Sequence, residues 1–134
     1  IKLAWGLDWD INLKRNTEQL LSIGAVKIIC DYDKFVGYFW FSLREKENDI
    51  FINSMQLKKE YQGKGIGTQI LNWIERCALN YNRQYLSLFV QKNNHKAIDF
   101  YHKFGFHDIF IEDGSICLRK KLNYENYQNN CGFS

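Results

Sequence analysis

The chain has 134 residues and a mass of 16.0 kDa, which is the size of one domain. Hydrophobic residues make up 46% and aromatic residues 16%, so there is enough apolar material for a core and a disordered protein is excluded. The net charge of +3 does not demand a nucleic-acid partner, although it leaves room for a local anion site.

No apolar run approaches the roughly 18 residues of a membrane-spanning helix, so we expect a cytoplasmic protein without a membrane partner. The first residues lack the long apolar stretch of a signal peptide, and the absence of an initial Met allows an upstream segment to have been removed. None of the cysteines forms a CxxC pair or has a His at metal-ligand spacing, which favours reduced thiols over a metal site or a disulfide framework. These cysteines are Cys30, Cys77, Cys117 and Cys131.

The first half of the chain predicts a short helix over residues 13–23, with Gly24 as its stop, followed by three strands. The strands are rich in β-branched and aromatic residues and are separated by short polar turns, so they form an antiparallel meander. They are expected at residues 25–30, 35–43 and 50–57.

The next segment predicts an amphipathic helix and then an apolar strand at residues 85–90. Apolar side chains recur at helical spacing along one face of the helix. That face consists of Ile66, Ile70, Leu71, Ile74, Cys77, Ala78 and Tyr81.

A second helix is expected over residues 94–104, with its apolar side chains at offsets of three and four. Asn94 is a suitable N-cap, and Gly105 is well placed to end the helix, with Phe106 folding back onto it. The apolar face comprises Ala97, Phe100, Tyr101 and Phe104. Around Asp113-Gly114 the flanking apolar segments predict a hairpin.

The strand–helix–strand passage over residues 50–90 implies a right-handed crossover and a parallel strand pair. Because the preceding strands are antiparallel, the fold class is a mixed α/β sheet flanked by helices. We expect a single domain over residues 1–122 and a polar, Asn-rich tail over 123–134.

The segment Gln62–Thr68 carries the clearest chemical signal, because it places three glycines and a lysine at the start of a helix. Free amides at a helix N-terminus carry partial positive charge, and glycines let an anion approach them closely. A phosphate or pyrophosphate is the natural ligand. The P-loop pattern fails because Gly65 follows Lys64, and the dinucleotide fingerprint fails because Thr68 and Ile70 stand where glycine is needed. A glycine-rich turn without a ligand remains the alternative.

The pattern Gln62-x-x-Gly65-x-Gly67 resembles the acyl-CoA pyrophosphate loop of the GNAT family of N-acetyltransferases. Further similarity lies upstream at residues 57–61 and downstream in Asn94-x-x-Ala97 and in residues 100–106, so it covers roughly residues 25–122. The resemblance implies the acyl-CoA N-acyltransferase fold, a mostly antiparallel sheet with a V-shaped splay between its two central parallel strands. The strand and helix that usually open the family's fold are not clearly visible here, so part of them is expected to be missing.

The resemblance also implies the ligand and the site. Acetyl-CoA is the expected co-substrate, with no metal. Its pyrophosphate would lie on the loop, and its pantetheine arm would bond to the end of the strand like an added strand. The cofactor-binding residues would be Met55, Gln56, Leu57, Gln62, Gly63, Lys64, Gly65, Ile66, Gly67, Thr68, Asn94 and Tyr101. Tyr101 would be the general acid that protonates the leaving thiolate, with a core aromatic as the alternative.

The general base cannot be assigned from the sequence, and a water relay is equally allowed. The candidates, each better explained as a solvated surface group, are Asp8, Asp10, Glu45, Glu47, His107 and Glu112. Aromatic residues could line an acceptor pocket or belong to the core. They are Trp5, Trp9, Phe39, Trp40 and Phe41.

These features predict an N-acetyltransferase that moves the acetyl group to a primary amine by direct attack in a ternary complex. The acceptor is a small amine or a protein amino group. A catalytically silent acyl-CoA sensor is a second class, and an acetyltransferase acting on aminoacyl-tRNA is a third. The short basic runs at residues 58–59 and 119–121 are interpreted as solvated faces rather than an RNA surface. A homodimer is compatible with the chain.

Overall fold

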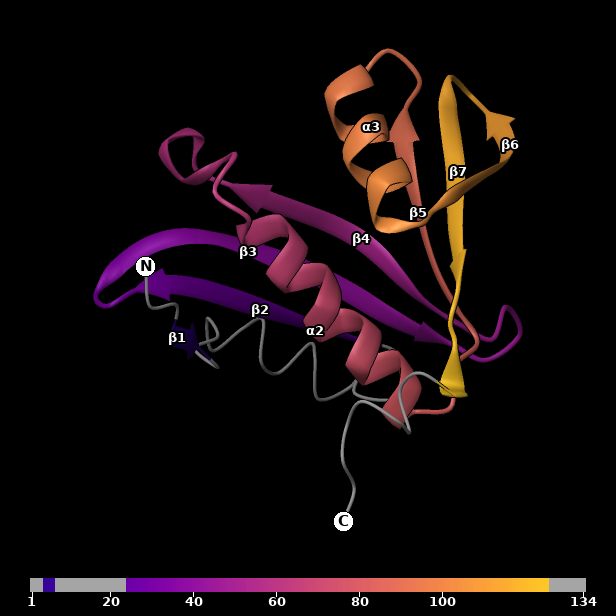
Figure 1. Cartoon of the computed structure of the whole chain (residues 1–134), viewed down its shortest axis with the longest axis horizontal. Helices are drawn as coiled ribbons and strands as arrows, with labels where there is room; N and C mark the ends of the chain where they lie inside the picture. The colour runs from indigo at the N-terminus through magenta and orange to yellow at the C-terminus, as the bar shows by residue number, and fades with distance from the viewer. Residues whose placement is uncertain (1–3, 7–23, 126–134) are drawn as a thin grey trace.

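The computed structural model describes residues 4–6 and 24–125. These residues form a seven-stranded mixed sheet with two α-helices packed on one face (Figure 1). The elements in chain order are β1 (Ala4–Gly6), β2 (Gly24–Asp31), β3 (Lys34–Arg44), β4 (Asp49–Leu57), a 3₁₀ turn (Lys59–Tyr61), α2 (Ile66–Asn80), β5 (Tyr85–Gln91), α3 (His95–Phe104), β6 (His107–Glu112) and β7 (Ser115–Lys121).

The strand order is β1-β2-β3-β4-β5-β7-β6. The predicted antiparallel meander is confirmed in β2, β3 and β4, and the predicted parallel pair is confirmed in β4 and β5. The hairpin of β6 and β7 turns at Asp113-Gly114, both with positive φ. The short strand β1, which the sequence pattern did not reveal, pairs with β2. The helix predicted at residues 13–23 lies outside the described residues.

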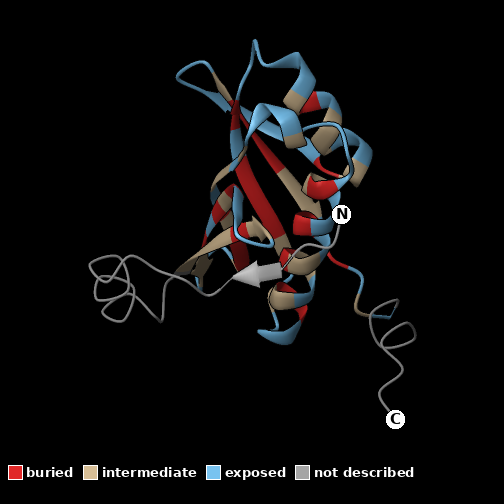
Figure 2. Cartoon of the chain, turned by 90° about the vertical axis from the view of Figure 1, so that its left-hand side faces the viewer, coloured by how far each residue is buried: buried red, intermediate tan, exposed pale blue. Residues whose placement is uncertain are grey.

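The core lies between the sheet and the two helices (Figure 2). Most of the predicted apolar face of α2 is buried, but Cys77 is only half-buried. At the C-terminal end Tyr81 is 57% exposed, and Leu79 is buried in its place. In α3 the buried residue is Ile98, which the predicted face did not include, while the four predicted side chains are half-buried against the core. Helix α3 ends as expected, because Gly105 adopts a φ of +115° and Phe106 packs against Tyr101.

The aromatic run in β3 is divided between the two faces of the sheet. Phe39 and Phe41 are buried and contact the ring of Trp73 on α2, with centroids 5.5 and 5.9 Å apart. Trp40 points to the opposite face and is 46% exposed. Phe39 and Phe41 therefore belong to the core, and Trp40 alone in this run is free to meet another molecule.

Strands β4 and β5 separate after four paired residues. They pair in parallel over Asp49–Ile52 and Tyr85–Leu88. At the point of separation the register of β4 against β3 shifts, because Asn53 is an extra residue between Ile52 and Ser54. Such a bulge bends a strand and increases its twist. The two strands diverge beyond it (Figure 1), which confirms the V-shaped splay that the family resemblance implies.

A buried ion pair holds the closed end of this splay. Asp49, at the start of β4, is fully buried and accepts hydrogen bonds from Arg44 on β3 at 2.9 and 2.7 Å. Arg119 on β7 lies 3.8 Å from the same carboxylate and donates to Ser87 on β5 at 3.1 Å. Four strands are thus joined where the sheet is still continuous.

The basic run at residues 119–121 is not a simple solvated face. Besides the partners of Arg119, the ammonium of Lys120 pairs with Glu75 on α2 at 3.1 Å and lies over the ring of Phe104 on α3. Beyond the predicted domain limit at residue 122, the hydroxyl of Tyr124 donates to the carbonyl of Arg83 at 2.6 Å. Lys120 and Tyr124 therefore pack against the two helices and the turn that follows α2.

Candidate active site

A cavity of about 510 Å³ opens between the diverging strands and the N-terminal ends of the two helices. Its walls come from the end of β4, the loop that leads into α2, and the first two turns of α3. The lining residues are Met55, Gln56, Leu57, Gln62, Gly63, Gly65, Gly67, Thr68, Asn94, Lys96, Ala97, Phe100 and Tyr101. Segments that are far apart in the sequence are thus brought to one site.

The free main-chain edge of β4 faces the gap. The amide of Lys58 donates to Val36 on β3 at 2.8 Å, and hydrogen-bonded pairs alternate with non-bonded pairs in an antiparallel ladder. Gln56 therefore also bonds to β3, whereas Met55 and Leu57 do not. The N–H groups of Met55 and Leu57 and the C=O group of Met55 point toward the space that β5 has left, while the C=O group of Leu57 accepts from the side chain of Gln62. An extended ligand can bond to them as a further strand would.

The loop before α2 presents free amides on an open surface. Gly63 and Gly65 have φ values of +73° and +83°, and nothing lies within 4 Å of where their side chains would be. The first carbonyl of the helical ladder is that of Gly65, which accepts from the amide of Gln69. The amides of the first helical turn, before Gln69, precede this ladder and carry the partial positive charge of a helix N-terminus. This is an anion-binding geometry.

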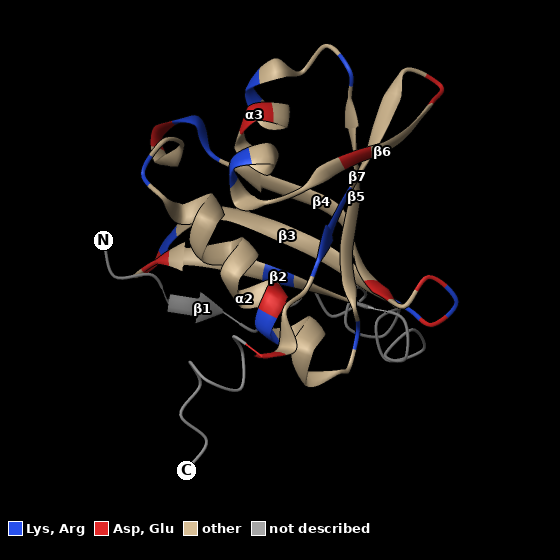
Figure 3. Cartoon of the chain, turned by 45° about the vertical axis from the view of Figure 1, so that its right-hand side comes forward, with Lys and Arg blue, Asp and Glu red and all other residues tan. Residues whose placement is uncertain are grey.

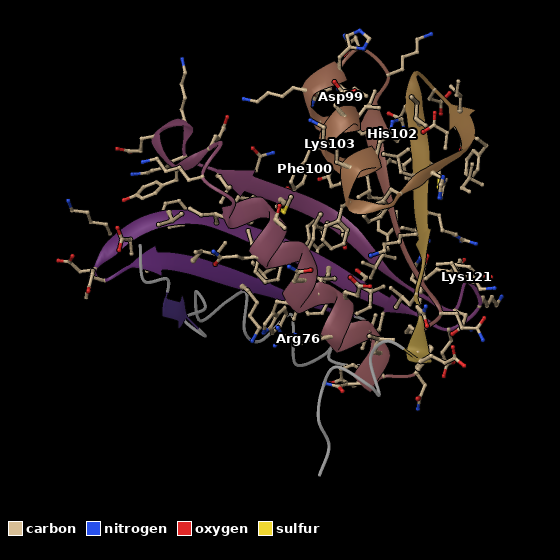
Figure 4. The ribbon with its side chains drawn as sticks, viewed as in Figure 1. Arg76, Asp99, Phe100, His102, Lys103 and Lys121 are labelled. Atoms are coloured by element: carbon tan, nitrogen blue, oxygen red, sulfur yellow. The ribbon has the colours of Figure 1, made fainter. Side chains whose placement is uncertain are left out.

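Gly67 has a different role from the other two glycines. A Cβ atom at this position would lie 2.9 Å from the ring of Phe100 on α3. Figure 4 shows Phe100 projecting from α3 toward α2. Glycine at residue 67 therefore lets the two helices approach closely and does not itself provide open space for a ligand.

The side chain of Gln62 spans the mouth of the cavity. Its amide nitrogen donates to the carbonyl of Leu57 at 3.0 Å, and its oxygen accepts from the ammonium of Lys96 on α3 at 3.5 Å. Gln62 thereby links the strand, the loop and the second helix.

Asn94 and Tyr101 come from α3. The Asn94 side chain accepts from the amide of Ala97 at 3.3 Å, which confirms the predicted N-cap, and it also lines the cavity. Tyr101 is half-buried, and desolvation raises its pKa to about 12. Its ring packs against Phe100 and Phe106, while its hydroxyl makes no hydrogen bond to any described residue. The hydroxyl therefore retains its proton at neutral pH and has that proton available for a ligand.

The charges around the cavity favour an anion. Lys96 is the charged residue of the lining, and no Asp or Glu is among the lining residues in the described part of the chain. Four of the candidate bases lie elsewhere on the surface: Glu45, Glu47, His107 and Glu112. Asp8 and Asp10, like Trp9 and the side chain of Trp5, lie outside what the structure describes. Among the residues that the structure describes, no carboxylate lines the cavity to serve as a general base.

Two of the predicted cofactor-binding residues do not line the cavity. Lys64 points outward over the ring of Tyr61, with its ammonium 6.0 Å from the ring centroid. Ile66 is 2% exposed and its side chain belongs to the core, so only its amide faces the loop. Conversely, Lys96 and Phe100 were not predicted, although they lie four residues apart on α3 and so share one helical face.

The sequence profile of the Acetyltransferase (GNAT) family matches residues 5–106. The chain belongs to this family. The GNAT resemblance of the loop and of the second helix is thereby confirmed.

Named relatives are about a third identical to this chain over the segments that align. The thialysine N-epsilon-acetyltransferase of Bos taurus is 32% identical over 84 residues, which are 62% of this chain and 49% of that protein. The uncharacterized N-acetyltransferase MJ1530 of Methanocaldococcus jannaschii is 33% identical over 99 residues, 67% of this chain and 62% of its own length. The chain thus spans about half the length of the first of these relatives.

Solved GNAT structures share the fold. The PaiA N-acetyltransferase of Thermoplasma acidophilum, in complex with coenzyme A, superposes with a TM-score of 0.74 at 20% identity over 84% of this chain and 69% of that one. A GNAT family acetyltransferase of Elizabethkingia anophelis with acetyl-CoA bound gives 0.68 at 18% identity, over 90% and 97% of the two chains. In the described part of this chain, no helix is both long and apolar enough to span a membrane.

Proposed function

We propose that this GNAT protein transfers the acetyl group of acetyl-CoA to a primary amine. The observation that carries the proposal is the cavity in which free amides of the α2 N-terminus, free main-chain groups of β4 and the hydroxyl of Tyr101 meet. Family membership supports the reaction class, and the names of the relatives support an amino group as the acceptor.

Each wall of the cavity suits one part of acetyl-CoA. The amides and open glycines of the loop would hold the pyrophosphate, because they combine partial positive charge with space. The free edge of β4 at Met55 and Leu57 would bond to the amides of the pantetheine arm. One of these backbone N–H groups would also stabilise the negative charge that develops on the thioester oxygen. Asn94 lines the same cavity and would contact the arm.

Tyr101 would act as the general acid. Attack of a neutral amine on the thioester forms an amide bond and breaks the carbon–sulfur bond, and the departing thiolate takes a proton. A tyrosine with a pKa raised to about 12 remains protonated, so its hydroxyl can donate that proton. The attacking amine loses its own proton to water, since the cavity offers no carboxylate among the described residues.

Replacing Tyr101 with Phe tests this assignment. Tyr101→Phe keeps the ring contacts and removes only the hydroxyl, so we expect kcat to fall by about a hundredfold or more while the Kd for coenzyme A is unchanged. Acetyl-CoA consumption over a panel of small amines and amino-terminal peptides measures the first quantity, and calorimetric titration measures the second.

Tyr124→Phe is the matched control, because that hydroxyl bonds to Arg83 away from the cavity. An unchanged kcat in Tyr101→Phe would remove the general-acid role. Binding of acetyl-CoA without turnover of any amine would instead identify a silent acyl-CoA sensor.

A further inference from the structure

Strand β6 forms an exposed edge of the described sheet. It has β7 as its neighbour and lies outermost (Figure 1), and all six of its residues are exposed. Ile109, Phe110 and Ile111 in its middle are 53%, 46% and 66% exposed. The free edge of such a strand offers unpaired N–H and C=O groups, which proteins usually guard with charged side chains, Pro, a bulge or a covering segment. The middle of β6 has no Lys or Pro, and its acidic residues stand toward the two ends (Figure 3).

A bulge determines which side chains of β6 share a face. The pairing with β7 shifts between Asp108 and Phe110, with Ile109 as the extra residue. On one face, His107, Phe110 and Glu112 lie opposite Arg119, Cys117 and Ser115. On the other face, Asp108 and Ile111 lie opposite Leu118 and Ile116. Without the bulge, His107 and Glu112 would point to opposite faces, because they are five residues apart.

We propose that a second copy of this chain docks on β6, with the two β6 strands antiparallel about a two-fold axis. Directly opposite residues of paired strands must lie on the same face. The register that satisfies this condition along the strand pairs His107 with Glu112 of the second copy and Asp108 with its Ile111. A shift by one residue in either direction pairs residues from opposite faces. One such shift also places Asp108 opposite Glu112, two like charges.

This pairing is complementary in charge and in apolar surface. His107 meets the carboxylate of Glu112 at both ends of the contact, once from each copy. In the middle, Ile109 of one copy meets Phe110 of the other. Phe110 already packs on Phe89, with ring centroids 5.7 Å apart, and Phe89 is itself 41% exposed. The contact therefore extends onto a continuous aromatic surface, and an isologous contact of this kind is the commonest form of oligomer.

The mass of the full chain in solution tests the interface. Sedimentation equilibrium should give twice the chain mass of 16.0 kDa, and Ile109→Lys should raise the dimer dissociation constant at least tenfold, because it places a charge in the pairing. Tyr32→Lys is the matched control, since Tyr32 is 77% exposed at the turn between β2 and β3 and should leave the dimer intact. Coenzyme A binding should be unchanged in both variants, because β6 does not line the cavity.

A charge exchange tests the register. His107→Glu places two carboxylates opposite one another, and Glu112→Lys removes the carboxylate that faces His107, so each should weaken the dimer. The double variant places a carboxylate at residue 107 opposite an ammonium at residue 112 and should recover it. A mass of 16.0 kDa at every concentration would overturn the proposal, with the edge then serving a different partner or none. A dimer that Ile109→Lys leaves intact would also overturn it. If the double variant has a dimer dissociation constant no lower than those of the single variants, the proposed register is wrong.

Discussion

Gly65 and Gly67, two residues apart, have different physical roles. Gly65 has a φ of +83° with open space beside it, so glycine is favoured there for its backbone conformation and not for its small size. Gly67 is helical, and glycine is needed there because a Cβ atom would lie 2.9 Å from the ring of Phe100. Phe100 lines the cavity from α3, so the small size of residue 67 determines how closely the walls of the cavity approach.

Gly67→Ala should therefore affect ligand binding more than folding. Alanine gains about 1 kcal/mol of helix propensity over glycine, which offsets the displacement of one ring. The moved ring narrows the cavity, so coenzyme A should bind roughly tenfold more weakly, about 1.4 kcal/mol. In a Phe100→Leu background the ring is absent, so Gly67→Ala should weaken coenzyme A binding much less than it does in the wild type. Calorimetric titration of the four proteins measures this coupling, and equal affinities for wild type and Gly67→Ala would contradict it.

The pKa of Tyr101 predicts the pH dependence of turnover. The acceptor amine must be neutral, so kcat/KM should rise with pH through the amine's own pKa. An ordinary tyrosine would lose its proton near pH 10, but burial raises the pKa of Tyr101 to about 12. With an α-amino acceptor, whose pKa is about 8, we therefore expect a plateau that persists through about pH 10. An alkaline decline with an apparent pKa of about 10 or below in the wild type, absent from Tyr101→Phe, would contradict this expectation.

At the scale of elements, the closed end of the splay depends on Asp49. Its fully buried carboxylate is bonded by Arg44, and this hydrogen bond raises the pKa of the Arg44 guanidinium. Removing one partner of a buried pair costs more than the pair itself contributes. Without Arg44 the carboxylate loses both of these hydrogen bonds and, among the described residues, keeps only Arg119, 3.8 Å away. The strands β3, β4, β5 and β7 all meet at this point, so the loss would be felt across the sheet.

Arg44→Met should lower the free energy of unfolding by about 3 kcal/mol. Methionine retains much of the apolar length of arginine, so the loss reports mainly on the buried carboxylate that remains. Lys46→Met, an exposed residue in the adjacent turn, should change stability by less than about 0.5 kcal/mol. Urea denaturation followed by circular dichroism measures both, and a similar small change in the two variants would refute the role of this pair.

Most elements could be predicted from the sequence because their signals are local. The period of α2, the N-cap at Asn94 and the turn at Asp113-Gly114 each depend on a few neighbouring residues. Errors arose where distant contacts decide burial. Tyr81 fits the helical period of α2 but lies just beyond the helix's C-terminal end, where the sheet no longer covers it. Strand β1 has three residues and gains its structure from pairing with β2.

At the scale of the whole molecule, the candidate active-site cavity follows from the way one sheet is divided. Strands β1, β2, β3 and β4 form one half, and β5, β7 and β6 form the other. The halves are joined at the closed end by four residue pairs and the ion pair of Asp49. The space between them is lined by the free edge of β4, by the N-terminus of α2 and by α3. Binding and chemistry can therefore share one cavity while the core remains undisturbed.

The family motif could place the loop in the site from the sequence, because the residues of the loop are contiguous. The motif could not distinguish Lys64, which points away, from Lys96, which lines the cavity from another element. Nor could it show that the side chain of Gln62 bonds to the carbonyl of Leu57. Such contacts depend on how α3 packs beside the loop, which is a property of the assembled sheet.

The most direct measurement is a pair of calorimetric titrations, one with coenzyme A and one with pantetheine, which has the same arm and thiol without the diphosphate. If the amides of the loop hold the diphosphate, coenzyme A should bind at one site per chain and pantetheine at least about a hundredfold more weakly. Gly65→Val, which forces a β-branched residue to a φ of +83°, an outlier conformation for such residues, should remove most of that difference. Absence of binding by coenzyme A, or equal affinities for the two compounds, would contradict the account.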